Sequence, residues 1–192
     1  MVYGKEENIT KQEDFSVADA PSYLKKLDLG CGANKKEGFL GVDISPNVNP
    51  DFIHDLNRYP YPFEDNSVFE IFTSHFIEHV GSIKAFMEEC WRILVPMGMM
   101  TIIAPYYSSV RSFQDYTHVR PISEMTFLYF NKEWMDTNKL DHYGVKCNFE
   151  ILNNRYYFAP DWEARADVAR EWARVHYNNV VLDIEVRLRA IK

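Results

Sequence analysis

Residues 27–32 read LDLGCG, and this stretch decides the fold class. The apolar-leaning run from Tyr23 to Leu29 stops at Gly30 and Gly32, which is the pattern of a strand followed by a tight glycine turn. Glycine lets the backbone turn sharply and approach a ligand closely. In open α/β sheets, ligands bind at the carboxyl ends of the strands. The turn therefore predicts a ligand site at the end of a first strand.

Short strands and one clear helix follow this turn. Apolar runs predict strands over residues 39–44, 52–56, 68–73 and 99–104. Apolar side chains at helical spacing predict a helix whose buried face is formed by Ile83, Phe86, Met87, Cys90, Trp91 and Leu94. Ser82 is its expected N-cap, and Pro96 with Gly98 is expected to end the element.

The C-terminal third has a different pattern. Residues 180–190 alternate between apolar and polar side chains, which is typical of an antiparallel strand with one solvated face. Residues 149–158 are the expected partner strand, and residues 160–177 are predicted to be helical. Parallel strands with helices first and an antiparallel pair last predict an α/β fold, a doubly wound and mostly parallel sheet with an antiparallel C-terminal edge pair.

The chain divides into an arm and one domain. Residues 1–20 are rich in charge and lack periodicity, so we expect a flexible arm there. Residues 21–192 are then a single domain. Residues 105–146 carry no clear secondary-structure pattern, and such long segments are usually functional, so they are predicted to be a lid or a substrate-binding insertion.

Composition limits the classes of function. The chain of 192 residues has 28 acidic and 21 basic residues and a net charge of −7, which disfavours a nucleic-acid partner. No apolar run approaches the ~18 residues of a membrane span, and the polar N-terminus is unlike a signal peptide. The 3 cysteines lack metal or disulfide spacing, which favours a reducing compartment. We expect a cytoplasmic protein that acts on a small molecule and has no membrane partner.

The LDLGCG string resembles the first motif of class I S-adenosylmethionine-dependent methyltransferases. The resemblance continues at GVD (41–43), HDL (54–56), FEIFTSHFIEHV (69–80) and RILVPMG (92–98). It is strongest for a small type-11-like subgroup, which shares the string YPFEDNS (61–67) and a shortened first helix. This resemblance implies a Rossmann-like, seven-stranded sheet, S-adenosylmethionine as cofactor and S-adenosylhomocysteine as product.

The resemblance also implies a set of cofactor-binding residues. Asp28 and the glycine turn would surround the amino-acid half of the cofactor, Asp43 would accept hydrogen bonds from both ribose hydroxyls, and Asp55 would accept one from the adenine amine. The implied set is Asp28, Leu29, Gly30, Cys31, Gly32, Asp43, Ile44, Asp55, Leu56, Ser74 and His75. Asp in a loop also commonly caps a turn, and this alternative stays open for Asp43 and Asp55.

Two places are candidates for catalysis. His75 follows the fourth strand and is the best candidate for a general base, although it could equally be a hydrogen-bonded residue of the turn. In the loop after the fifth strand, Asp115 is expected to orient His118, or both meet the substrate, while Arg120 anchors an anionic group. The alternative is a loop held by its own hydrogen bonds.

Two further expectations concern the acceptor pocket and metals. Tyr106 and Tyr107 are candidate lining residues for the acceptor, although aromatic pairs on strands are more often core. His75, His79 and His118 lack the tight spacing of metal ligands, so no metal site is expected.

These observations favour transfer of a methyl group to an O or N atom of a small or medium acceptor. Analogy with similar small enzymes suggests a sugar or a sugar-linked metabolite. An alternative is a catalytically silent S-adenosylmethionine-binding subunit that regulates a partner, because no unambiguous base or acceptor motif is present. A dehydrogenase is disfavoured, since Lys35 stands where the dinucleotide pattern requires a third glycine.

Overall fold

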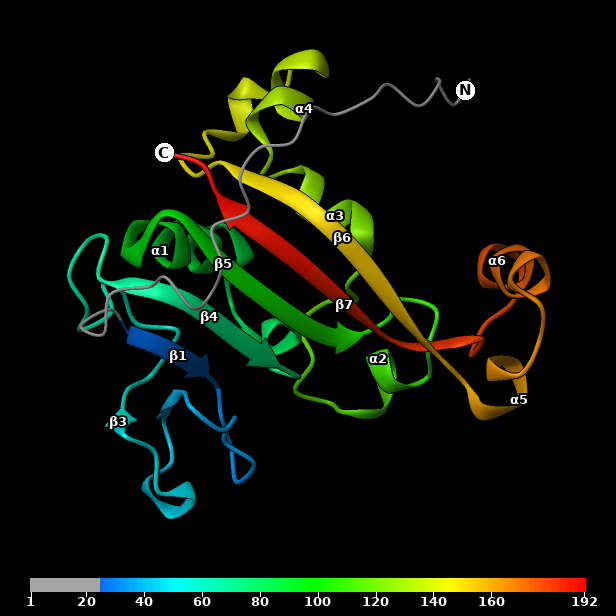
Figure 1. The fold of residues 1–192 in the computed structure, drawn as a ribbon, viewed down its shortest axis with the longest axis horizontal. Coiled ribbons are helices and arrows are strands. Elements are labelled where there is room, and N and C mark those ends of the chain that lie inside the picture. The colour runs from blue at the N-terminus through cyan, green and yellow to red at the C-terminus, as the bar shows by residue number, and fades with distance from the viewer. Residues whose placement is uncertain (1–24) are drawn as a thin grey trace.

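Figure 1 shows a computed structural model of the chain, in which residues 25–192 are described. The expected flexible arm, residues 1–20, lies outside this range. One 7-stranded sheet has the order β3-β2-β1-β4-β5-β7-β6. The strands are β1 (Lys25–Leu29), β2 (Leu40–Asp43), β3 (Phe52–Ile53), β4 (Val68–Ser74), β5 (Leu94–Pro105), β6 (Phe149–Phe158) and β7 (Val181–Ala190).

The sheet confirms the predicted fold class. The pairs β1–β2, β2–β3, β1–β4 and β4–β5 are parallel. Strand β7 pairs with β5 and with β6 in the antiparallel sense, so β6 runs in the same direction as β5. The alternation over β7 matches its burial, with Val186, Leu188 and Ala190 in the core and Arg187 exposed.

The connection from β1 to β2, residues 30–39, contains no helix, in line with the shortened first helix that the resemblance implies. The carboxylate of Asp28 accepts a hydrogen bond from the backbone N–H of Lys36 at 2.7 Å, and the N–H of Gly30 donates to the carbonyl of Val42 at 2.9 Å. These two bonds hold the loop of residues 30–39 against the ends of β1 and β2. The loop therefore delivers the glycine turn to the carboxyl edge of the sheet.

Helix α1 (Ile83–Ile93) follows the predicted stripe. The hydroxyl of Ser82 accepts from the N–H of Ala85 at 3.2 Å, as an N-cap does, and the buried residues are Phe86, Met87, Glu89, Cys90 and Ile93. The strand after it begins at Leu94 rather than at Met99, because Leu94 already pairs with Val68. A register shift follows, and Met97 has a φ of 65°, a left-handed conformation that usually favours glycine.

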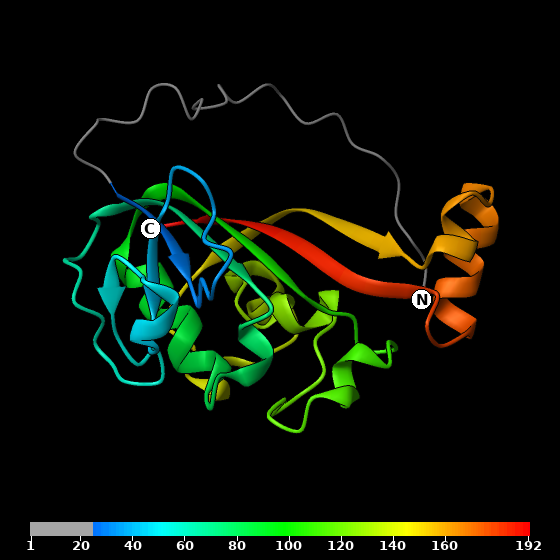
Figure 2. The same cartoon turned by 90° about the horizontal axis from the view of Figure 1, so that it is seen from below.

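Residues 105–146 are folded rather than structureless. They contain α2 (Arg111–Gln114), α3 (Glu124–Leu128), α4 (Lys132–Thr137) and the 3-10 turn η4 (Asp141–Tyr143). Ile122 and Phe127 are fully buried, so part of the segment belongs to the core. Figure 2 shows α1, α3 and α4 on the same face of the sheet. The sequence missed these elements because each is shorter than two helical turns.

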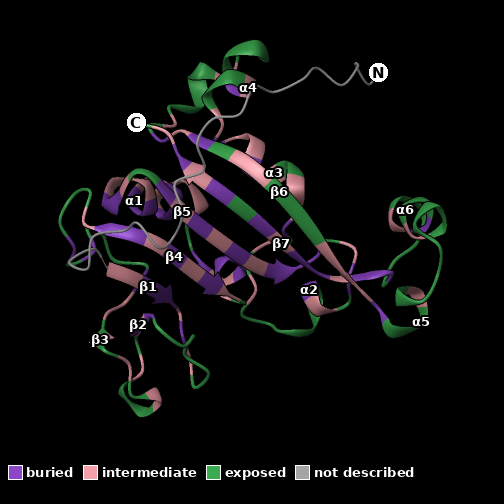
Figure 3. Ribbon diagram, in the orientation of Figure 1, coloured by how far each residue is buried: buried purple, intermediate pink, exposed green. Residues whose placement is uncertain are grey.

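The region between β6 and β7 also differs from its prediction. Residues 160–177 form two helices, α5 (Pro160–Glu163) and α6 (Asp167–His176), because Ala166 is extended with a ψ of 144°. Both lie beyond the end of the β6–β7 hairpin and are largely exposed (Figure 3). Trp172 is 52% exposed, so this large apolar side chain is not buried in the core. No helix within residues 25–192 is long and apolar enough to cross a bilayer.

Candidate active site

A pocket of about 300 Å³ lies where β1, β2 and β4 end, at the lower end of the usual volume of small-molecule sites. Its lining residues are Gly30, Asp43, Ile44, His54, Asp55, Leu56, Asn57, His75, Phe76 and His79. The first motif, the end of β2, the residues after β3 and the turn after β4 thus meet at one edge of the sheet.

Gly30 lines the pocket at the turn that follows β1. Its φ is +70°, and a Cβ atom there would lie 2.6 Å from the ring of Phe76. The turn therefore requires glycine for its conformation and for the close approach of Phe76. Sequence reasoning identified Gly30 but missed Phe76, whose role depends on the turn packing against it.

Asp43 and Asp55 line the pocket and also cap turns. The carboxylate of Asp43 accepts the N–H of Gly32 at 3.0 Å on Oδ2 and the N–H of Ser45 at 2.9 Å on Oδ1. The carboxylate of Asp55 accepts the N–H of Asn57 at 3.0 Å. Each carboxylate oxygen has a second lone pair, so both side chains can still accept from a ligand. The capping alternative and the ligand-binding role are therefore compatible.

His75 stands at the end of β4 in a strained backbone conformation. Its φ is +53°, uncommon for a residue with a side chain, and its N–H donates to the carbonyl of Ile103 at 2.9 Å. Nδ1 lies 3.6 Å from Oε1 of the buried Glu78. The neighbouring Glu78 carboxylate raises the pKa of His75 above its ordinary value.

The comparisons with known proteins agree with this arrangement. Residues 27–102, from β1 into β5, match the family model described as "Methyltransferase domain". The match over residues 27–102, together with the fold, supports the predicted class I methyltransferase fold and enzyme class and S-adenosylmethionine as the cofactor. No curated protein matches the chain in sequence.

Solved structures similar to this methyltransferase support its fold. YcgJ from Bacillus subtilis has a TM-score of 0.58 and 14% identity, over 91% of this chain and 94% of that one. A SAM-dependent methyltransferase from Archaeoglobus fulgidus has a TM-score of 0.58 and 18% identity, over 88% and 86%. A geranyl diphosphate C-methyltransferase from Streptomyces coelicolor has a TM-score of 0.55 and 12% identity, over 87% and 73%.

Several predicted cofactor residues are not among the residues that line the pocket: Asp28, Leu29, Cys31, Gly32 and Ser74. Leu29 is fully buried in the core. Asp28 is 2% exposed and accepts a hydrogen bond from the backbone N–H of Lys36. Burial raises the pKa of Asp28. Burial likewise raises the pKa of Cys31 to about 11. These residues shape the loop around the pocket.

The loop after β5 differs in detail from its prediction. Nδ1 of His118 bonds to the carbonyl of Ser112 at 3.1 Å, so Ser112, and not the Asp115 side chain, orients this imidazole. The Asp115 carboxylate accepts the N–H of Thr117 at 2.8 Å and its hydroxyl at 2.7 Å. The same hydroxyl lies 3.0 Å from Nδ1 of His79. Asp115 therefore acts on His79 through Thr117, a contact that sequence separation concealed.

The side chain of Arg120 makes hydrogen bonds to the backbone of this chain. Its guanidinium donates to the carbonyls of Val80 at 2.6 Å and Gly81 at 2.9 Å. These bonds attach the loop after β5 to the turn after β4. The structure thus gives Arg120 a positioning task, and its contact with an anionic group stays a prediction.

The two candidate acceptor tyrosines are also placed away from the cofactor pocket. Tyr106 is 1% exposed, and its hydroxyl accepts from Nη1 of Arg174 at 3.1 Å. Tyr107 lines a different pocket, together with Val110, Phe113 and others. The core alternative therefore describes Tyr106, and neither side chain lines the site that holds His75.

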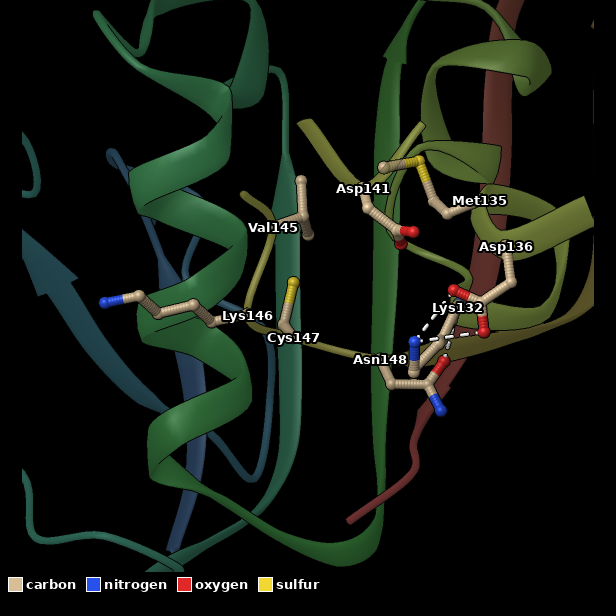
Figure 4. Close-up of a pocket in the computed structure, with 8 residues that line it drawn as sticks. All are labelled: Lys132, Met135, Asp136, Asp141, Val145, Lys146, Cys147 and Asn148. Atoms are coloured by element: carbon tan, nitrogen blue, oxygen red, sulfur yellow. Dashed lines mark hydrogen bonds and ion pairs between the residues drawn. The ribbon is translucent and has the colours of Figure 1, made fainter. Parts of the chain in front are cut away.

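Another pocket, of about 250 Å³, lies beside α4 (Figure 4). Its polar groups are paired with one another: Lys132 Nζ donates to Asp136 at 2.8 Å, and Lys132 N–H donates to Asn148 Oδ1 at 2.9 Å. Figure 4 shows Lys146 directed away from that pair. This pocket offers few convergent free polar groups, so it is the weaker ligand site.

Proposed function

We propose that this methyltransferase binds S-adenosylmethionine in the pocket at the ends of β1, β2 and β4 and transfers its methyl group to an O or N atom of a small or medium acceptor. The observation that carries this proposal is the convergence of Asp43, Asp55 and His75 on one pocket with the glycine turn at Gly30.

Binding is explained by two carboxylates and two apolar side chains. Asp43 would accept hydrogen bonds from the ribose hydroxyls, and Asp55 would accept one from the adenine amine. Ile44 and Leu56 follow these carboxylates and also line the pocket. Ile44 is 63% exposed, so a flat base placed against it would remove apolar surface from water.

When bound, the cofactor supplies a methyl group on a positively charged sulfur. The chain would hold the acceptor atom in line with that methyl group, and orientation of this kind is worth ~7–11 kcal/mol of the barrier. His75 would accept the proton that the acceptor loses, which contributes about 10²–10⁴-fold. Its Nδ1 faces Glu78, so Nε2 is the nitrogen that would take the proton, and the carboxylate would stabilise the imidazolium.

The chemistry of the pocket lining favours a polar acceptor. The pocket lining offers three imidazoles, one amide and two carboxylates, which suit a polar molecule such as a sugar or a sugar-linked metabolite. Fold alone does not fix the acceptor, because a geranyl diphosphate C-methyltransferase shares this architecture. A net charge of −7 still disfavours nucleic acid.

Thermal unfolding with S-adenosylmethionine, S-adenosylhomocysteine or NAD tests the proposal. A ligand at one hundred times its Kd adds about 2.7 kcal/mol of stability. In a domain of this size the midpoint then rises by roughly 5–10 °C. We expect this rise with both adenosyl compounds and none with NAD. No rise with either adenosyl compound would overturn the proposal.

A further inference from the structure

A cluster of two imidazoles and a carboxylate lies beside the cofactor pocket. Glu78 and His79 belong to the 3-10 turn η3 (Ile77–His79), and His118 comes from the loop after β5. One ligand atom from each of the three side chains lies within 4.8 Å of the other two. We propose that these residues bind one divalent transition-metal ion, of which zinc is the best match.

The first argument is the state of Glu78. Its side chain is 2% exposed, and neither carboxylate oxygen makes a hydrogen bond with any residue of the range 25–192. Oε1 lies 3.6 Å from Nδ1 of His75 and 3.9 Å from Nε2 of His118, both longer than a hydrogen bond. A buried carboxylate without partners is costly, and metal coordination is one of the few ways to satisfy it.

The second argument is the hydrogen bonding of each imidazole. Nδ1 of His118 donates to the Ser112 carbonyl, which can only accept, so Nε2 is the nitrogen of this ring that can face an ion. The Thr117 hydroxyl donates to the Asp115 carboxylate and must therefore accept from Nδ1 of His79. Nδ1 of each imidazole is therefore engaged in a hydrogen bond, which leaves Nε2 of each ring as the atom that can coordinate an ion.

These outer hydrogen bonds have the arrangement found around bound metals. A metal-binding histidine usually donates its second N–H to a carbonyl or a carboxylate, which fixes the orientation of the ring. Here a backbone carbonyl serves His118, and a threonine supported by Asp115 serves His79. His118 lies far from Glu78 and His79 in the sequence, which explains why sequence spacing gave no metal prediction.

The donor set selects the kind of ion. Two imidazoles and one glutamate are the protein ligands of several catalytic zinc sites, which leave a position open for water or substrate. Magnesium and calcium prefer sites made wholly of oxygen ligands. His79 also lines the cofactor pocket, so an ion here would stand at the rim of that pocket. If the proposed function holds, the open position would face an oxygen atom of the acceptor.

Metal binding can be measured without cofactor or acceptor. The full-length protein is stripped with a chelator and titrated calorimetrically with Zn²⁺, and visible absorption with Co²⁺ reports imidazole ligation. We expect one ion per chain. Glu78→Gln and His118→Ala should each weaken binding at least 100-fold. Thr117→Val removes only the outer support of His79 and should weaken it about 10–100-fold. His142→Ala, at an exposed imidazole elsewhere, is the matched control and should change nothing.

Three results would overturn the inference. These are absence of a stoichiometric ion in the wild-type protein, undiminished binding in both Glu78→Gln and His118→Ala, or an equal loss in His142→Ala. If Glu78→Gln fails to fold, the wild-type stoichiometry and His118→Ala still decide. Titration with S-adenosylhomocysteine separates this inference from the proposed function, because loss of cofactor binding with the ion retained contradicts only the latter.

Discussion

The pocket is built by two segments that hold their side chains in different ways. In residues 27–102, Gly30, Asp43 and His75 each stand directly after a parallel strand or at its end, so the sheet itself fixes their position. In residues 105–146, His118 is placed by backbone contacts between short turns instead. We therefore expect the first segment to be a preformed part of the proposed cofactor site. The position of the second segment depends on a few hydrogen bonds.

The largest effect is expected at the glycine turn. Gly30→Ala adds the cost of a left-handed side-chain residue and displaces Phe76, for a combined destabilisation of about 3 kcal/mol. The unfolding midpoint should fall by roughly 10 °C, and the rise induced by S-adenosylhomocysteine should be lost. Calorimetric unfolding measures both effects.

Gly144→Ala is the matched control for this turn. Gly144 has a φ of +60°, but a Cβ atom at this position would meet no atom within 4 Å, so only the backbone cost of about 1 kcal/mol applies. Ligand-induced stabilisation should be retained. Equal losses in both variants would show that the contact with Phe76 does not matter.

A smaller effect is expected where the second segment is attached. Arg120→Ala removes two hydrogen bonds to the carbonyls of Val80 and Gly81 and should cost about 1–3 kcal/mol. Amide hydrogen exchange should rise in residues 113–120, while affinity for S-adenosylhomocysteine stays nearly unchanged. Arg187→Ala, on an exposed strand position, is the control. If exchange is unaffected and only the KM for an anionic acceptor rises, Arg120 binds substrate after all.

The smallest effect is a dependence of stability on pH in the first segment. The hydrogen bond from Lys35 and the N–H of Gly41 lower the pKa of Asp51 below 3.8. A lowered carboxyl pKa contributes stability that is present above pH 3.8 and is lost as pH falls through the folded-state value. The difference in unfolding midpoint between wild type and Asp51→Asn should thus be constant near neutral pH and shrink below pH 3.8. A difference that grows on acidification would contradict this sign.

The contrast between the segments also explains what the sequence could predict. Strand ends follow from local patterns, so the order of residues alone is enough to place the glycine turn, Asp43, Asp55 and His75 at one edge of the sheet. The stripe of α1 is equally clear, because Phe86, Met87 and Cys90 repeat at helical spacing and are all fully buried.

The remaining features depend on contacts between distant residues. Asp115 is close to His118 in sequence, yet its carboxylate bonds to Thr117 and so supports His79, 38 residues before Thr117. The helical pattern of residues 160–177 did not show the break at Ala166, since alanine favours helices but is extended here. Neither the contact between Thr117 and His79 nor the helix break at Ala166 is indicated by the residues next to it in the sequence.

The central claim is that the carboxylate at the end of β2 holds the ribose of S-adenosylmethionine. Calorimetric titration of Asp43→Ala with S-adenosylhomocysteine tests it most directly, with the exposed Asp161→Ala as control. Two hydrogen bonds to a charged acceptor are worth about 3 kcal/mol together, so the Kd should rise about 100-fold in Asp43→Ala and stay unchanged in the control. A folded Asp43→Ala protein with wild-type affinity would contradict the account.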